Sequence, residues 1–343
     1  MIIPARNEET NIARVIHSLA AQQDVHEILV VDDQSTDRTA CIVDKLKGDI
    51  LGLRIICIES LPPGWVGKTH AAAAGAKEAK GEWLLFTDAD TEHLPLSLHE
   101  LLGRAEREQV DLLSLSPGQV MRTWWEKATL PTVYVWLAKR FRFDEVNDPA
   151  SPVAAANGQY ILVRRETYDR VGGHESVRDA MLEDVALARL VKSSGGRLLF
   201  LPGASWVRTR MYGTFSGMWE GWTKNLYLLA GERTGPLLKT MVTFCLLDYL
   251  PLGAVLVFGF AAAVDLMDWK LAVPLMLPGM FSFILRGLRY SSAIARLGFE
   301  PALGDYRIPG SFLFSLLLLN SAWTYRRGHK VKWKGRTYPA GRV

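Results

Sequence analysis

Short apolar runs alternate with stretches of helical periodicity over roughly the first 205 residues of the chain. Four runs rich in Leu and β-branched residues, each bounded by turn residues, predict strands: EILVVDD (27–33), LRIICIE (53–59), EWLLFTDAD (82–90) and DLLSLS (111–116). Spacing near 3.6 residues predicts helices over 8–21, 36–47, 67–80 and 95–108. This alternation is typical of an α/β fold, with a mostly parallel sheet covered by helices on both faces.

The pattern changes further along the chain, where long apolar segments begin. Residues 241–264 carry one charge, Asp248, and are long enough to cross a bilayer, which takes roughly 20 apolar residues. A second segment, about 271–289, contains two prolines, and a third, 309–325, is uncharged and ends in aromatic residues. Three such segments in a row predict transmembrane helices over 236–325, rather than buried helices of a soluble domain.

The number of crossings decides on which side of the membrane the C-terminal tail lies. If the N-terminal domain is cytosolic, three crossings place a basic tail outside, against the tendency of basic segments to stay inside. We therefore expect one segment to be re-entrant and the tail to lie on the same side as the N-terminal domain. The chain also opens inside a predicted strand, Met1-Ile2-Ile3-Pro4, so a missing N-terminal anchor is another way to remove the conflict.

Charge separates the parts of the chain further. The 343 residues carry a formal charge of +4 and are 49% apolar and 22% charged, which excludes disordered and low-complexity architectures. The tail, 326–343, holds seven basic side chains and no acidic one, so the body before it is slightly acidic. The tail suits the anionic headgroup layer, and the body disfavours nucleic-acid binding. Cys41, Cys57 and Cys245 show no ligand spacing and are expected to be buried free thiols.

Acidic residues gather where the predicted strands end. Asp33 follows one strand, and Asp88 and Asp90 follow another. Because ligands bind beyond the carboxyl ends of the strands in such sheets, these side chains are expected to rim a crevice. Two carboxylates two residues apart can reach one hard cation, so Asp88 and Asp90 predict a site for Mg²⁺ or Mn²⁺ with room for substrate phosphates.

Two further motifs carry candidate chemistry. Lys68 lies in PPGWVGKTH (62–70), where Pro62 replaces the glycine that a P-loop requires. A lysine at a helix N-terminus still suits a diphosphate, although a solvent-facing lysine explains it as well. Glu183 and Asp184 begin a helical stretch. They complement the helix dipole, or one of them acts as a general base toward an acceptor hydroxyl.

Five segments in this order resemble the family 2 glycosyltransferases with a GT-A fold: PARNEE (4–9), VVDDQSTDRT (30–39), GWVGKTHAAAAG (64–75), FTDADT (86–91) and LEDVALA (182–188). The membrane-bound subgroup that glycosylates lipids such as hopanoids and carotenoids is most similar, because it shares the Gly-Trp-x-Gly-Lys loop, C-terminal transmembrane helices and an ending like VKWKGRTYP (331–339). The resemblance implies a Rossmann-like GT-A catalytic domain over 1–210 and an interfacial amphipathic helix region over 211–235.

The resemblance also implies roles for the residues that match these motifs. The positions expected to border a nucleotide-sugar donor are Pro4, Arg6, Glu8, Asp33 and Lys68. Of these, Asp33 would accept a hydrogen bond from the nucleobase. Asp88 and, more surely, Asp90 would bind the metal. Asp184 would be the catalytic base with Glu183 as its neighbour. A cation that neutralises the departing nucleoside diphosphate, opposite a base that activates the acceptor, implies inversion at the anomeric carbon.

One motif departs from the processive members of the family. They carry Gln-x-x-Arg-Trp on an interfacial helix, whereas Met218-Trp219-Glu220-Gly221-Trp222 keeps only the tryptophan. This departure favours transfer of a single sugar. We expect Trp222 to line the acceptor site, whereas for Trp219 a simple interfacial anchor is an equal alternative. The loops 157–159 and 172–174 are expected to frame the acceptor pocket. His174 in the second loop is expected to be structural.

These residues and the resemblance predict a membrane-anchored, multi-pass, metal-dependent, inverting glycosyltransferase with a cytosolic catalytic domain. It would move one sugar from a nucleotide-diphosphate sugar, UDP-linked in the leading interpretation, to a membrane lipid. One alternative is a polyprenyl-phosphate glycosyltransferase, whose anionic acceptor needs little help from a base. Another is a catalytically inactive membrane scaffold with the same fold. No nucleic-acid partner is expected.

Overall fold

The structure is a computed structural model that describes residues 1–328 and 330–338. The described chain forms two compact units. Unit 1 comprises Met1–Val120, Ala138–Gly213 and the C-terminal residues from Lys332, and unit 2 comprises Met121–Leu137 and Thr214–Val331. Most of the residues that the sequence offers as catalytic or binding candidates lie in unit 1.

Unit 1 is built on a seven-stranded sheet in the order β3-β2-β1-β4-β8-β6-β9. The strands are β1 (Ile2–Ala5), β2 (Ile28–Asp32), β3 (Leu53–Cys57), β4 (Trp83–Phe86), β6 (Leu112–Ser116), β8 (Ile161–Arg164) and β9 (Leu198–Pro202). Strand β8 runs antiparallel to β4 and β6, and the other pairs are parallel. This confirms the predicted mostly parallel sheet and all four predicted strands.

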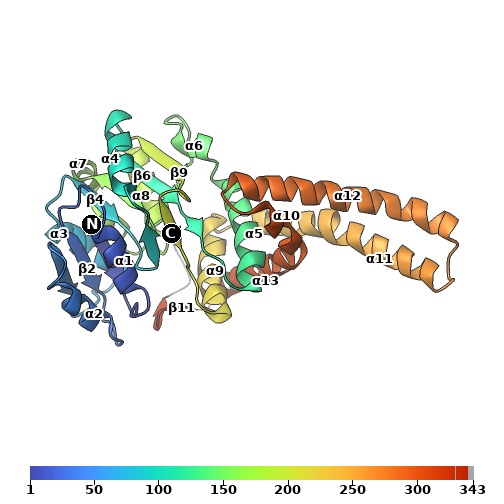
Figure 1. Ribbon diagram of the computed structural model, residues 1–343, viewed down its shortest axis with the longest axis horizontal. Helices are drawn as coiled ribbons and strands as arrows, with labels where there is room; N and C mark the ends of the chain where they lie inside the picture. The colour runs from blue at the N-terminus through green and yellow to red at the C-terminus, as the bar shows by residue number, and fades with distance from the viewer. Residues whose placement is uncertain (329, 339–343) are drawn as a thin grey trace. The chain divides into compact units, whose positions relative to one another are not determined.

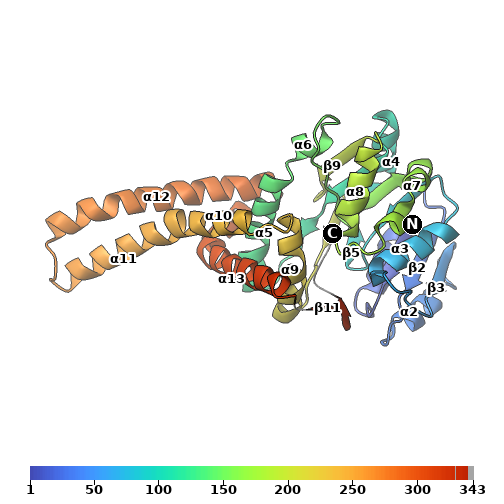
Figure 2. The ribbon, with the colours of Figure 1, turned by 180° about the vertical axis from the view of Figure 1, so that it is seen from behind.

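Helices cover both faces of this sheet, as the sequence predicted (Figure 1). The helices and helical turns of unit 1 are α1 (Ile12–Ala20), α2 (Thr39–Leu46), α3 (Gly67–Glu78), α4 (Ser97–Arg107), α6 (Phe143–Asn147), α7 (Arg165–Arg170), η1 (Gly173–Val177) and α8 (Glu183–Ser193). Neighbouring residues of a strand point to opposite faces, so Ile2 packs with α3 and α8 while Ile3 packs with α1 and α2. Figure 2 shows α3 and α8 together on their face.

Helix α3 packs closely on the centre of the sheet because it carries small residues toward it. Ala71, Ala72 and Ala76 are buried there. A Cβ atom at Gly75 would come within 2.5 Å of Ile2 and 2.9 Å of Val31, so only glycine fits at this position. The close packing fixes the N-terminus of α3, where Lys68 lies, against the carboxyl ends of β1 and β2.

A second sheet of unit 1 has three strands in the order β5-β10-β7, namely β5 (Thr91–His93), β10 (Val207–Thr209) and β7 (Gly118–Gln119). Strand β5 follows directly after Asp90 and pairs antiparallel with β10. The chain that carries the two metal-ligand candidates is therefore held at both ends, by β4 in the large sheet and by β5 in the small one.

The rest of the described chain is helical apart from one hairpin. These elements are α5 (Trp124–Arg140), α9 (Phe215–Leu229), α10 (Thr234–Phe244), the π-helix η2 (Cys245–Tyr249), α11 (Leu250–Ala263), α12 (Trp269–Arg296), η3 (Pro301–Tyr306) and α13 (Arg307–Arg326). The strands β11 (Val331–Trp333) and β12 (Arg336–Tyr338) form a two-stranded sheet. Figures 1 and 2 show α11 and α12 side by side.

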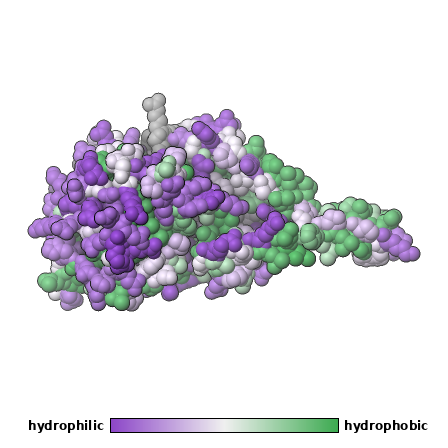
Figure 3. Space-filling model, turned by 90° about the horizontal axis from the view of Figure 1, so that it is seen from above, coloured by the Kyte–Doolittle hydropathy of each residue, from purple (hydrophilic) through white to green (hydrophobic). Residues whose placement is uncertain are grey.

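Two helices among the described residues are long and apolar enough to cross a membrane: Thr234–Ala263, which joins α10, η2 and α11, and Trp269–Arg296. Length and composition are weak evidence, because core helices of soluble proteins pass the same test. In these two, however, only 6% of the apolar window is buried. Figure 3 shows hydrophobic residues over the outer surface of α11 and α12 and hydrophilic residues at their tip.

The sequence predicted three crossing segments, and the third, 309–325, lies in α13, which is not one of these two helices. Helix α13 instead packs on α9 through polar contacts. Ser321 donates to the backbone oxygen of Thr223 at 2.6 Å, and Tyr325 donates to that of Lys224 at 2.7 Å. These hydroxyl groups are among the polar side chains that α13 carries.

Asp248, the one charged residue of the apolar segment 241–264, forms ion pairs. Asp248 is fully buried and accepts from Arg286 at 2.9 Å and from Arg307. A buried carboxylate needs such partners, because removal from water costs several kcal/mol for an unpaired ion. All three side chains belong to unit 2.

The cysteines differ from the prediction in one respect. Cys41, Cys57 and Cys245 are free thiols, as expected, but all three are exposed. Cys41 lies on the outer side of α2, and Cys57 ends β3, the edge strand of the large sheet. The expectation of burial was wrong because it rested on the usual preference of cysteine, which says nothing about an edge strand or an outer helix face.

Candidate active site

The carboxyl ends of β1, β2 and β4 meet at one edge of the large sheet. The residues predicted to border the nucleotide-sugar donor lie at this edge. Arg6 follows β1, and its Nη1 atom donates to the backbone oxygens of Asp33 at 2.5 Å and Gln34 at 3.1 Å. Pro4 lies within β1, opposite Val31 of β2. Arg6 thus ties the end of β1 to the turn after β2. The strand order reverses between β1 and β4, so the end of β1 also borders the point where such sheets bind ligands.

The candidate metal ligands lie in the turn after β4. Asp90 has one buried carboxylate oxygen, Oδ1, without a hydrogen-bond partner. Burial raises the pKa of Asp90 to about 8, helped by the charges of Asp88 and Glu8, while Lys334 and Lys68 oppose the rise. A buried oxygen that lacks a donor is suited to a cation, so this carboxylate fits Mg²⁺ or Mn²⁺.

Among the described residues, no group of three or more His, Cys, Asp or Glu side chains is arranged to hold a metal by itself. Mg²⁺ commonly uses one or two carboxylates and takes its other ligands from water and substrate phosphates. Asp88 and Asp90 are sufficient for a site of that kind and insufficient for a metal held entirely by protein.

Lys68 joins the two acidic motifs. Its Nζ atom lies 2.7 Å from Oδ1 of Asp88 and 2.8 Å from Oε1 of Glu183. Burial lowers the pKa of Lys68, but Asp88, Glu183 and Asp184 raise it more, and the net pKa is well above its ordinary value. The amine therefore stays charged. The structure thus brings together three residues that the sequence treated as separate motifs, and it excludes the solvent-facing alternative for Lys68.

Asp184 lies in the first turn of α8, and both of its oxygens accept backbone N–H groups. Gly158 donates to Oδ2 at 2.9 Å, and Val185 donates to Oδ1 at 2.8 Å. Burial, followed by the charge of Glu183, raises the pKa of Asp184 to about 6, although Lys68 and the two N–H groups counteract the shift. A carboxylate with a pKa near neutrality is a suitable general base. The loop 157–159 thus holds the Asp184 carboxylate, a contact that the sequence did not predict.

Two buried histidines near the site are structural. His174 shares a hydrogen bond of 2.9 Å with the Tyr168 hydroxyl, which supports its exclusion from the catalytic residues. His93 lies in β5 and shares a hydrogen bond of 3.0 Å with Thr87. Burial lowers the pKa of His93 to about 3 and that of His174 to about 4, so both stay neutral.

Trp222 lies on α9 in unit 2, and only 3% of it is exposed. Trp219 is partly exposed on the same helix. The predicted role of Trp222 in the acceptor site stays a prediction.

Sequence reasoning missed the part that the C-terminal hairpin plays. Lys334 forms an ion pair with Glu8, and Arg336 forms one with Asp33. The tail was expected to face lipid headgroups, and for these two cations that expectation was wrong. The signal was present in the segment VKWKGRTYP, but no local pattern tells which acids a distant cation will meet.

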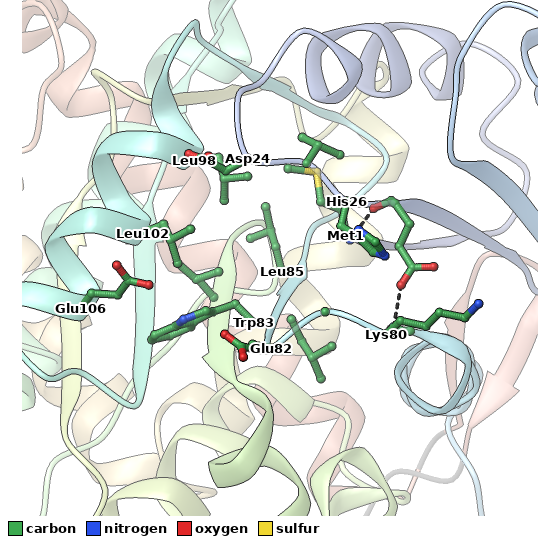
Figure 4. Close-up of a pocket in the computed structure, with 16 residues that line it drawn as sticks. Met1, Asp24, His26, Lys80, Glu82, Trp83, Leu85, Leu98, Leu102 and Glu106 are labelled. Carbon is green, nitrogen blue, oxygen red and sulfur yellow. Dashed lines mark hydrogen bonds between the residues drawn. The ribbon is translucent and has the colours of Figure 1, made fainter.

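A pocket of about 380 Å³ in unit 1 lies elsewhere (Figure 4). Met1, His26 and Trp83 line it, and these residues are at the amino ends of the parallel strands β1, β2 and β4. It is therefore at the edge of the sheet opposite to the carboxylates. Ligands of such sheets bind at the carboxyl ends, so the carboxylate edge, and not this pocket, is the candidate active site.

The mostly parallel sheet, the acids at its carboxyl edge and the acidic pair at the start of α8 are those of a glycosyltransferase with a GT-A fold. The sequence profile of glycosyl transferase family 2 matches residues 1–172, and the chain belongs to that family.

The relatives agree with this assignment. The chain is 28% identical over 348 residues to the 4,4'-diaponeurosporenoate glycosyltransferase of Staphylococcus aureus strain MRSA252, with 98% of this chain and 87% of that protein covered. It is also 28% identical over 347 residues to the protein of that name from strain USA300, with the same coverage. The chain is thus similar to a carotenoid-related glycosyltransferase along nearly its whole length.

A solved structure with the same fold is the mannosyltransferase of Pyrobaculum calidifontis in complex with GDP-Man and Mn²⁺. The two have a TM-score of 0.54 and 18% sequence identity, and the match covers 94% of this chain and 85% of that one. At this identity the likeness concerns the fold.

Proposed function

We propose that this glycosyltransferase moves one sugar from a nucleotide-diphosphate sugar to a membrane lipid, with the help of Mg²⁺ or Mn²⁺ and with inversion at the anomeric carbon. The observation that carries the proposal is the buried oxygen of Asp90, beside Asp88, that has no hydrogen-bond partner, because such an oxygen suits the cation that accompanies a diphosphate donor. The mannosyltransferase with the same fold is described with GDP-Man and Mn²⁺, which supports a donor and a metal of these classes. A UDP-linked sugar is the first donor to test.

A lipid acceptor is supported by two independent features. The relatives act, by their names, on a carotenoid acid, 4,4'-diaponeurosporenoate. The chain also exposes two long apolar helices, which suit the hydrocarbon layer of a membrane. An enzyme whose acceptor is dissolved in the bilayer benefits from being held there, since both reactants are then confined to one surface.

The side chains of unit 1 divide the work of such a transfer. Asp88 and Asp90 would hold the cation, which neutralises negative charge on the leaving nucleoside diphosphate. Lys68, at the N-terminus of α3, would add a positive charge beside the same leaving group. With a hydroxyl acceptor, Asp184 would accept the proton as that oxygen attacks the anomeric carbon, and two backbone N–H groups hold the Asp184 carboxylate. A carboxylate acceptor, such as the acid in the relatives' names, is already ionised and would attack without a base. Attack opposite to the leaving group inverts the anomeric centre.

The experiment uses membranes that contain the full chain, incubated with a panel of radiolabelled nucleotide sugars and lipid extracts. We expect one labelled lipid product, identified by mass spectrometry, whose formation stops with EDTA and returns with Mn²⁺. Asp90→Asn should abolish transfer, whereas the exposed neighbour variant Glu92→Gln should retain it. Undiminished transfer in EDTA would refute the metal. Failure to transfer any sugar of the panel, together with failure to bind its nucleotides, would favour the inactive scaffold.

A further inference from the structure

The C-terminal hairpin of β11 and β12 lies on the carboxylate edge of unit 1. Lys334 donates to Oε1 of Glu8, and its own backbone oxygen accepts from Nε of Arg6 at 3.0 Å. Arg336 donates to both oxygens of Asp33, at 2.9 Å from Nη2 and more closely from Nη1. These contacts join parts of the chain that are more than 300 residues apart.

The hairpin covers the two acids that the family resemblance placed beside the nucleotide. Only 5% of the Asp33 side chain and 11% of the Glu8 side chain are exposed. Both oxygens of Asp33 accept from Arg336 and its side chain is almost fully covered, so a nucleobase N–H group can reach Asp33 only if the guanidinium moves. A donor that uses this edge must therefore give the two cations of the hairpin a new partner.

The N-terminus of α3 shows what kind of partner that is. A Cβ atom at Gly67 would overlap with Nη1 of Arg336, so glycine is needed for the guanidinium to reach the first turn of the helix. The backbone N–H of Gly67 also donates to the hydroxyl of Tyr338 at 3.4 Å. A cation beside the positive end of a helix dipole is unfavourable. An anion at the same place is stabilised by the cation and by the helix dipole.

We propose that Lys334, Arg336 and Tyr338 are donor-binding residues, and that the diphosphate of the donor takes the place of Glu8 and Asp33 as the partner of the two cations. The exchange leaves Asp33 free to accept a hydrogen bond from the nucleobase. The hairpin then lies over the bound nucleotide and contacts its phosphates. The inference rests on the proposed function, because it requires a nucleoside diphosphate at this edge.

The geometry favours a hairpin that binds the diphosphate of the donor, here called a clamp, over a hairpin that merely blocks the site. Two cations, a hydroxyl and a helix N-terminus converge where the donor's negative charge is expected, and Arg336 can form paired hydrogen bonds with phosphate oxygens as it does with Asp33. Lys334 is also near the metal candidates, since its charge acts on Asp90. A segment that only blocked the site would need no such match to an anion.

The test is calorimetric titration of the full chain in lipid nanodiscs with UDP or GDP and Mn²⁺, and with the matching nucleoside, uridine or guanosine. Lys334→Ala and Arg336→Ala should each weaken binding of the nucleoside diphosphate by about ten- to a hundredfold, the usual effect of losing a charge-assisted hydrogen bond. The nucleoside, which has no phosphate, should bind Arg336→Ala as well as the wild type or more tightly, because Asp33 is then free.

Lys330→Ala is the matched control, since Lys330 is an exposed cation of the same tail, and it should bind like the wild type. Arg336→Lys should recover part of the diphosphate affinity. Equal or tighter binding of the diphosphate by Arg336→Ala would overturn the clamp and leave the proposed function standing. A wild type that binds none of these diphosphates with Mn²⁺ would overturn the proposed function and the clamp together.

Discussion

The amine of Lys68 lies 2.8 Å from Oε1 of Glu183 and, on its other side, 2.7 Å from Oδ1 of Asp88. One lysine at the start of α3 therefore bridges the turn after β4 and the first turn of α8. The bridge holds the metal-ligand candidates close to the proposed base, although Asp90 and Asp184 are 94 residues apart in the sequence.

Removal of the bridge should affect stability as well as transfer. Lys68→Met leaves Asp88 and Glu183 without their shared partner, and we expect the free energy of unfolding to fall by about 1–2 kcal/mol, a reduced value because 35% of the lysine side chain is exposed. Differential scanning fluorimetry in detergent measures the change. Lys77→Met, an exposed lysine on the same helix, is the control, and equal melting of the two variants would contradict the bridge.

The pKa of Asp184 predicts the acid limb of the pH profile. A base must be deprotonated to accept a proton, and burial and Glu183 raise the pKa of Asp184 to about 6. Transfer should therefore fall about tenfold per pH unit below pH 6. Asp184→Asn should lower the rate by about a hundredfold or more, and the exposed control Asp179→Asn should leave it unchanged.

Two results would argue against a base at Asp184. One is a transfer rate that stays constant down to pH 5. The other is nearly full activity of Asp184→Asn, which would favour an acceptor that is already ionised, either a lipid carboxylate or a polyprenyl phosphate.

The buried carboxylate of Asp90 should lower the stability of the protein in EDTA and raise it when Mn²⁺ is bound. Its folded-state pKa, about 8, is above the unfolded value of about 3.9, so its contribution to stability is present at low pH and is lost as the pH rises through 8. In EDTA at pH 7.5, Asp90→Asn should thus be more stable than the wild type, by a free energy on the order of a few kcal/mol. With Mn²⁺ the wild type should gain stability and the variant should not.

Thermal unfolding with and without Mn²⁺ checks this prediction. Glu92→Gln, which alters an exposed acid two residues away, should respond to Mn²⁺ as the wild type does. A destabilised Asp90→Asn in EDTA would show that the carboxylate already has a partner.

The two buried histidines predict a loss of stability in mild acid. Burial lowers the pKa of His93 to about 3 and that of His174 to about 4, while the unfolded value is about 6.5. The unfolded chain therefore takes up protons first, and stability falls as the pH drops below 6.5, by about 2 kcal/mol for each histidine at pH 5. Urea unfolding at pH 7.5 and pH 5 measures the difference. His174→Asn should remove about half of it, and a variant of the exposed His99 should remove none.

The contacts of the hairpin predict the side of the C-terminus. Lys334 and Arg336 pair with acids of unit 1, so the chain end should lie on the same side of the membrane as the catalytic unit. A topology reporter fused after Val343 should report the same side of the membrane as a reporter fused at the N-terminus. A reporter that scored on the opposite side would overturn both this topology and the hairpin contacts.

The sequence by itself determined the elements and the class of the protein. Apolar runs bounded by turn residues located β2, β3, β4 and β6, because strands of a sheet covered by helices on both faces read as nearly continuous hydrophobic runs. Acids at strand ends located the site, since the ends of parallel strands share one edge. Five local motifs in a fixed order indicated the family, which the sequence profile confirms.

Only the tertiary structure decided which distant groups meet. Strand β8 enters the sheet antiparallel between β4 and β6, and Gly158 just before it donates to Asp184. Lys68 meets Glu183 across two elements, and Arg336 returns to Asp33 from the other end of the chain. Hydrophobic periodicity reports only which face of an element is buried. The partner of a charged side chain depends on how the whole chain closes, because an ion pair is set by a distance of a few ångströms in space and by no spacing along the sequence.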